Sequence, residues 1–130
     1  MAQFKTELYI GLRPDSDKIY VLNEPLIYQS DLIGRTIEIP AGFNTDFASV
    51  PRLPFIFTLW GDRAHREAVV HDYLYRIDSK PVVSISTANK VFLEAMEARS
   101  KPRRVRWPMY LGVCLGGFGS YHKRLVMDRL

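Results

Sequence analysis

The chain has 130 residues, of which 47% are hydrophobic and 25% charged, and its formal net charge is +4. This length suits one domain over residues 1–130 that buries a core without metal or disulfide cross-links. An internal disulfide is excluded because Cys114 is the single cysteine, and its apolar surroundings predict a buried thiol. No secretory signal is recognisable at the start, and the apolar run 109–119 is far shorter than the roughly 20 residues that cross a bilayer. We therefore expect a soluble protein that folds in the cytoplasm.

Charge is distributed unevenly along the chain. Residues 1–98 hold ten Lys and Arg against thirteen Asp and Glu, a balance of −3, whereas residues 99–130 hold eight against one, a balance of +7. Such a basic surface is typical of proteins that bind nucleic acid or an anionic membrane, but it equally suits docking onto an acidic protein, which we favour. The predicted basic docking face consists of Arg103, Arg104, Arg106, Trp107, Lys123 and Arg124.

The first forty residues predict an antiparallel sheet. Apolar and polar residues alternate from Phe4 to Arg13, which is the period of a strand with one buried face. Further strands are expected at 19–22, 26–28 and 33–39, separated by turn residues. A small meander of three or four strands accommodates them.

Residues 41–60 predict an irregular loop, because the sequence has no regular period there and contains Pro51 and Pro54. Small polar residues in such a loop, here Asp46 and its neighbours, usually bond to their own backbone. The alternative is that Asp46 reaches across to the histidine-bearing segment that follows.

That segment, residues 61–77, has a helical period and contains HREAVVHDYLY. His71 shares a stripe with Tyr75 and two alanines, so its side chain is expected to point into the protein. Asp72 lies on the adjoining stripe, where it could form an ordinary i, i+4 ion pair with Arg76. His71 is the candidate for chemistry because histidine exchanges a proton near neutral pH.

A zinc site is not expected on this helix. His65 and His71 are six residues apart, about 240° around a helix, so they cannot share one metal ion.

Two more helices are expected toward the C-terminus. One begins near Ser84 or Ser86 and runs to about Arg99, and the short connection 78–83 predicts that it packs antiparallel to the first. Asn89 would then lie level with the middle or end of the first helix. The last helix should follow Pro102 or Pro108, pack closely through Gly112 and Gly116, and end at Gly119. The expected fold class is therefore α+β: mostly strands over 1–40, a loop over 41–60, and about three packed helices over 61–130.

Three motifs, GFNTDFASVPR, AVVHDYLYR and ANKVFLEAM, occur in that order. They resemble a family carried by bacteriophages and prophages and described only as domain of unknown function 1353, and the likeness extends from Ile39 to about Gly119. The resemblance implies a phage origin without implying an activity. This chain departs from the family pattern at Asn89, where the second helix usually has Asp.

The helix pair also resembles that of phospholipases A2, in which a His-Asp-x-x-Tyr motif faces an Asp on an antiparallel helix. The likeness implies His71 as general base, Asp72 as calcium ligand, and Tyr75 with Asn89 as supports for the histidine. An amide at 89 can accept a hydrogen bond but cannot stabilise an imidazolium by charge. The glycine-rich calcium loop is absent upstream, so Asp72 is a poor calcium site unless Asp46 and backbone carbonyls contribute.

Two functions remain in view. The one we place first is an accessory protein of the phage virion or its assembly, associated with the tail or the head-tail region, which binds other phage structural proteins or itself. It would be found in the host cytoplasm during infection and in the virion thereafter, without a cofactor. The alternative is a His71-centred hydrolase of lipids or esters, with calcium as the only conceivable cofactor. Inhibition of a host factor also fits the size and origin, but no residue argues for it.

Overall fold

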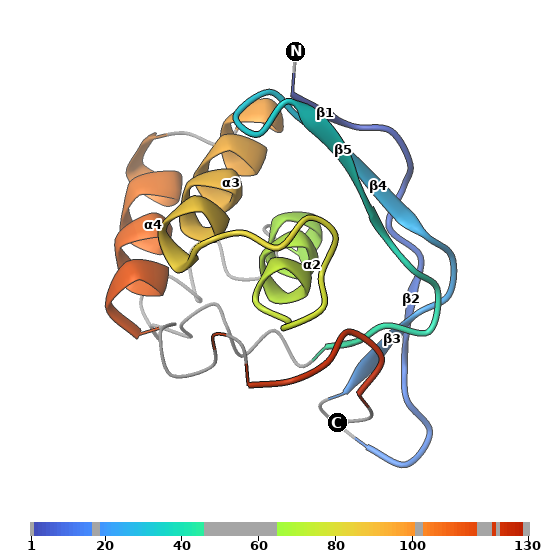
Figure 1. Cartoon of the computed structure of the whole chain (residues 1–130). Coiled ribbons are helices and arrows are strands. Elements are labelled where there is room, and N and C mark those ends of the chain that lie inside the picture. The colour runs from blue at the N-terminus through green and yellow to red at the C-terminus, as the bar shows by residue number, and fades with distance from the viewer. Residues whose placement is uncertain are drawn as a thin grey trace.

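The computed structural model describes residues 2–16, 19–45, 65–100, 103–116, 121 and 123–128. Strands form the N-terminal part and helices the C-terminal part, which confirms the α+β class. Figure 1 shows helix α2 (His65–Leu74) in the middle of the molecule. The strands lie on one side of α2, and helices α3 (Ile85–Ala98) and α4 (Arg103–Gly116) lie on the other (Figure 1).

The described strands form two small antiparallel sheets. The first has the order β1-β4-β5, with β1 at Gln3–Phe4, β4 at Leu26–Ser30 and β5 at Arg35–Ile39. The second has the order β2-β3-β6, with β2 at Ile10–Leu12, β3 at Tyr20–Leu22 and β6 at Asn44–Thr45.

Two expectations about the strands are wrong. A single meander does not form, because the predicted first strand divides into β1, which pairs with β4, and β2, which pairs with β3. Strand β6 falls within the predicted loop, and it forms because β3 has a free edge that takes Asn44 and Thr45. The rest of the predicted loop, from 46 onward, lies outside the described residues.

Helix α3 has the predicted bounds. Ser84 caps it, since its hydroxyl accepts a hydrogen bond from the Thr87 N–H at 3.1 Å. The apolar face of this helix is fully buried and consists of Ala88, Val91, Phe92, Ala95 and Met96.

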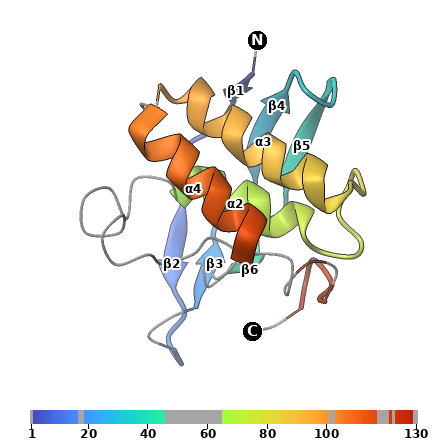
Figure 2. The same ribbon diagram turned by 90° about the vertical axis from the view of Figure 1, so that its left-hand side faces the viewer.

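Helix α4 begins at Arg103 and holds Pro108 within it, where the missing N–H removes one hydrogen bond. The described part of the helix runs to Gly116, and the predicted end at Gly119 lies outside the described residues. Met109 and Val113 of this helix are buried in a cluster with residues of α2 and α3. Figure 2 shows α4 in front of the other helices.

The larger hydrophobic core lies between the strands and helices α2 and α3, and a smaller one joins the three helices. No helix in the described ranges is long and apolar enough to cross a membrane.

Candidate functional site

Helix α2 is surrounded by protein. Every residue from 67 to 76 is buried, including the charged residues Glu67, Asp72 and Arg76. Because buried charges are costly unless they are paired or hydrogen-bonded, each of these side chains should have a defined partner.

The buried imidazole of His71 joins α2 to α3. Its Nε2 atom lies 2.6 Å from Oδ1 of Asn89, and the Tyr75 hydroxyl donates to the same oxygen at 2.7 Å. The His71 ring packs against Tyr75 and Phe92, with ring centroids 4.2 Å and 5.2 Å away. The sequence therefore correctly predicts that His71 points inward and that Asn89 lies level with it. We call His71, Tyr75 and Asn89 the histidine cluster.

The chemistry of this cluster follows from its partners. An amide oxygen only accepts hydrogen bonds, so Nε2 of His71 carries the proton and Nδ1 is the basic nitrogen. Burial, opposed only in part by the Asn89 hydrogen bond, lowers the pKa of His71 to about 4. Burial also raises the pKa of the Tyr75 hydroxyl, which therefore stays protonated as a donor. At neutral pH the cluster is uncharged.

Cys114 lies at the edge of this cluster on α4. Its Sγ atom is 3.7 Å from Nδ2 of Asn89, yet the residue is exposed. The expectation of a buried thiol is wrong, because α4 packs through Met109 and Val113 and leaves the face that carries Cys114 outward.

Asp72 and Arg76 attach α2 to strand β6. The Thr45 hydroxyl donates to Oδ2 of Asp72, and Arg76 donates to the backbone oxygen of Asn44 at 3.1 Å. A second hydrogen bond from Arg76 reaches the Leu125 oxygen at 3.4 Å. Both side chains thus have partners in β6: Asp72 accepts from Thr45, and Arg76 donates to the Asn44 oxygen.

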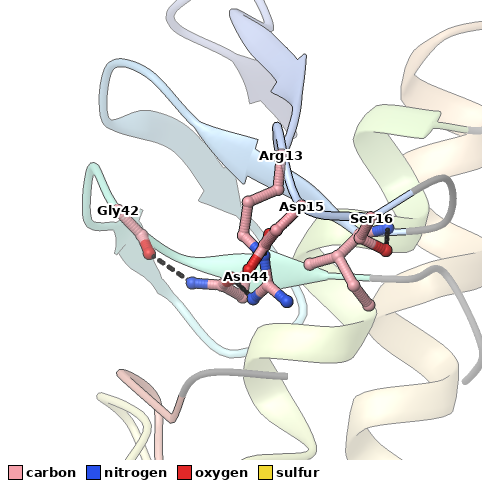
Figure 3. A network of polar contacts seen from close by, with 6 residues as sticks. Arg13, Asp15, Ser16, Gly42 and Asn44 are labelled. Carbon is pink, nitrogen blue, oxygen red and sulfur yellow. Dashed lines mark hydrogen bonds and ion pairs between the residues drawn. The ribbon is translucent and has the colours of Figure 1, made fainter.

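Asn44 extends this attachment to the hairpin between β2 and β3. Its Oδ1 accepts from Arg13 at 3.0 Å, and its Nδ2 donates to the Gly42 oxygen at 3.0 Å (Figure 3). Arg13 is held in turn by Asp15 at 2.5 Å (Figure 3). Strand β6 is thus fixed on both sides immediately next to the Asp72 carboxylate.

A calcium site does not fit the described residues. No group of three or more His, Cys, Asp or Glu that could hold a metal occurs in the described ranges. Calcium takes six to eight oxygen ligands, whereas one carboxylate and one hydroxyl meet at Asp72 and Thr45. Asp46, the proposed additional ligand and catalytic residue, lies outside the described residues.

The predicted basic docking face divides into two places. Arg103, Arg104 and Trp107 are exposed along α4, but the Arg106 side chain is only 18% exposed and lies 3.6 Å from Glu97 of α3. Lys123 and Arg124 are exposed in a segment that docks on the turn after α2, where the Ile77 N–H donates to the Arg124 oxygen at 2.9 Å. This segment lies apart from α4 in Figures 1 and 2.

Sequence reasoning missed two acidic residues that organise the interior. Glu67 is fully buried one turn before His71 and lies 3.3 Å from Arg99. Glu94 accepts three hydrogen bonds at 2.7 Å, from the hydroxyls of Tyr28 and Ser30 and from the Leu32 N–H. Glu67 lies four residues before His71, so the helical spacing could have indicated that it shares the buried face with that residue. Nothing in the sequence pattern indicates the partners of Glu94.

Residues 20–113 match the family described as "Protein of unknown function (DUF1353)". This span covers β3 to most of α4 and includes the whole histidine cluster. Neither a curated protein nor a solved structure matches the chain. Because the family match covers well over half of its length, this chain belongs to the DUF1353 family.

Proposed function

We propose that this chain is an accessory protein of a bacteriophage virion or of its assembly, and that it acts by binding another structural protein through helix α4. The observation that carries the proposal is the outward face of this helix. Trp107, Leu111 and Leu115 are 44%, 55% and 77% exposed, and their four-residue spacing puts them on one side of the helix.

The chemistry of this face suits a protein partner. Large exposed apolar side chains in a row are costly in water and often mark interaction sites, and tryptophan is enriched among the residues that dominate binding energy. Arg103 and Arg104 are exposed at the start of the same helix, so their guanidinium groups can pair with carboxylates of a partner. The partner we propose is a structural protein with an apolar groove flanked by acidic residues.

The burial of the histidine cluster supports binding over catalysis. His71 is 0% exposed and its pKa is lowered to about 4, so it is neutral and enclosed at the pH of a cell. In that setting the hydrogen bonds to Asn89 serve to join α2 and α3, which positions α4 for docking.

The test uses a phage whose genome encodes this chain. Mass spectrometry of purified particles is expected to find the protein, and the double variant Trp107→Ser with Leu111→Ser should be lost from particles while remaining folded by circular dichroism. The matched control is Tyr9→Ser with Leu12→Ser, which removes two side chains of similar exposure far from α4 and should leave incorporation unchanged. Absence of the wild-type protein from particles, or equal incorporation of both variants, would refute the proposal.

One observation favours a second candidate, a hydrolase related in mechanism to phospholipase A2. With Nε2 bound to Asn89, the basic Nδ1 of His71 is the atom that can take a proton from water while the water oxygen attacks an ester carbonyl carbon. The ester C–O bond then breaks, and the imidazolium returns the proton to the leaving alkoxide. The enclosed ring must first become accessible, and a base with a pKa of about 4 is weak, so we place this function second.

Assays of phospholipid and simple ester hydrolysis, with and without calcium, test the second candidate. A hydrolase requires that activity exists and is lost in His71→Ala. It should also rise in Asn89→Asp, because a carboxylate stabilises the imidazolium that forms during proton transfer. Activity that is absent, or unchanged in His71→Ala, would eliminate this candidate.

A further inference from the structure

A hollow of about 550 Å³ lies between strand β1, the first turn of α2 and the end of α3. Figure 1 shows β1 and the end of α3 side by side at the top of the molecule. The nine lining residues come from three separate segments: 3–7, Arg66 and 98–100. The lining includes three basic side chains, Lys5, Arg66 and Arg99, and one acidic side chain, Glu7.

The positive charge in this hollow is not neutralised by the protein. The side chains of Lys5 and Arg66 have no hydrogen bond or ion pair within the described ranges. The Glu7 carboxylate accepts a hydrogen bond from the exposed Tyr9 hydroxyl at 3.0 Å and pairs with neither. Cations that share one hollow repel each other, and a bound anion relieves that repulsion.

Arg99 adds a cation that is fixed in place. Its Nη1 atom lies 3.3 Å from Oε1 of the buried Glu67, while the side chain as a whole is 33% exposed. A guanidinium has five N–H donors in a planar fork, so the contact with Glu67 orients the group and leaves further donors for a ligand.

Ser100 brings a hydroxyl to the same place through an unusual backbone. It follows the C-cap residue of α3, Arg99, with a φ of 59°, in the left-handed region where glycine is the usual residue, and its N–H donates to the Glu97 oxygen at 2.9 Å. A serine with this positive φ is more strained than a glycine would be, but its hydroxyl lines the hollow with a hydrogen-bond donor.

We infer that this hollow binds the phosphate group of a small phosphorylated molecule. Compact groups with several anionic oxygens match the fork of an arginine, and a volume of this size is typical of small-molecule pockets. The hollow is separate from the α4 face and from the histidine cluster. A negative result for phosphate binding therefore leaves the proposed functions of those two sites untouched.

NMR titration of the ¹⁵N-labelled chain with inorganic phosphate tests the inference, with chloride added at equal ionic strength as the reference. Saturable amide shifts are expected at residues 3–7, 66 and 98–100. The same residues should respond to glycerol phosphate. Arg66→Gln and Lys5→Gln are each expected to weaken binding by about tenfold, the loss of one charge-assisted hydrogen bond. Lys90→Gln, which removes an exposed cation of α3 outside the hollow, should bind as the wild type does.

Three results would overturn the inference. The first is a titration without saturable shifts at these residues, and the second is equal binding by Arg66→Gln, Lys5→Gln and Lys90→Gln. The third is binding to vesicles of phosphatidylglycerol in the absence of any response to soluble phosphates, which would make the surface a membrane contact. Ser100→Gly should weaken binding while leaving α3 intact by circular dichroism, which separates a ligand contact from a purely structural residue.

Discussion

Nε2 of His71 and Oδ1 of Asn89 lie 2.6 Å apart inside the core, and this contact joins α2 to α3. The two groups are matched in charge, because a neutral imidazole donates to a neutral amide and no net charge is buried. Burial of the enclosed ring, opposed only in part by the Asn89 hydrogen bond, keeps its pKa low, at about 4.

Asn89→Asp is expected to raise the pKa of His71 from about 4 by roughly one to three pH units, because a carboxylate at this distance favours the imidazolium. An NMR titration of the histidine ring protons measures the change. Asn23→Asp, at an exposed turn position, is the matched control and should leave the His71 titration where it is. An unchanged pKa in Asn89→Asp would mean that residue 89 does not contact the ring in solution.

The free energy of unfolding should depend on the protonation of His71 between pH 6.5 and about 4. The folded pKa lies below the unfolded value of 6.5, so in this range the unfolded chain takes up a proton that the folded chain rejects. The free energy of unfolding therefore has its full value above pH 6.5 and falls as the pH is lowered. The loss that His71 causes reaches about 3 kcal/mol when the pH equals the folded pKa.

Urea denaturation across this pH range, for the wild type and for His71→Gln, isolates this contribution from that of the carboxylates. Glutamine retains an N–H donor for Asn89 but does not titrate, so its curve should be flatter than that of the wild type. Parallel curves would show that folding does not lower the pKa of His71.

Tyr75→Phe removes a hydroxyl that donates to Asn89 at 2.7 Å in the core. The expected loss is about 1 kcal/mol of unfolding free energy, the typical value for one buried hydrogen bond when the acceptor keeps another donor. Urea denaturation measures it. Tyr9→Phe is the control, since that hydroxyl meets Glu7 at the exposed surface and should contribute nothing measurable. Equal effects of the two substitutions would contradict the assigned geometry.

Much of the helical part was predictable because its signals are local. The Ser84 cap, the bounds of α3 and the inward orientation of His71 all follow from residue type and helical spacing. The strands were less predictable. Residues from Phe4 to Arg13 alternate as one strand should, but β1 and β2 take different partners, and strand pairing depends on long-range contacts that a local period does not contain.

The candidate site shows the same contrast between features that local helical spacing predicts and features that depend on long-range contacts. The sequence places His71, Tyr75 and Asn89 at compatible levels of two antiparallel helices, and the three side chains meet there, whereas Asp72 bonds to Thr45 of β6. Helical i, i+4 spacing allows an ion pair between Asp72 and Arg76, but it contains no information about partners on other elements. Because α2 is buried, strand β6 supplies hydrogen-bond partners to both side chains, and these could not be predicted from the sequence.

Glu94 gives the strongest prediction outside the histidine cluster. Its Oε1 accepts from Tyr28 and Ser30, and its Oε2 accepts from the Leu32 N–H, so one carboxylate attaches α3 to β4 and to the turn that follows it. Burial and this hydrogen bond raise the pKa of the Tyr28 hydroxyl, which remains a donor at any pH in ordinary use. Glu94→Gln replaces one of the two acceptor oxygens by an NH₂ group. Because an NH₂ group cannot accept, at least one of the donors that face Glu94 loses its acceptor.

We expect Glu94→Gln to lower the unfolding free energy by about 1 to 3 kcal/mol, the cost of an unsatisfied group next to a buried tyrosine. Glu97→Gln on the same helix is the matched control. Its carboxylate is half exposed and 3.6 Å from Arg106, and a surface pair of this kind should change stability by no more than about 0.5 kcal/mol. Both values come from urea denaturation at neutral pH. Equal losses of unfolding free energy in Glu94→Gln and Glu97→Gln would contradict the prediction. The hydrogen bonds that Glu94 accepts from β4 and the turn after it would then contribute nothing to stability.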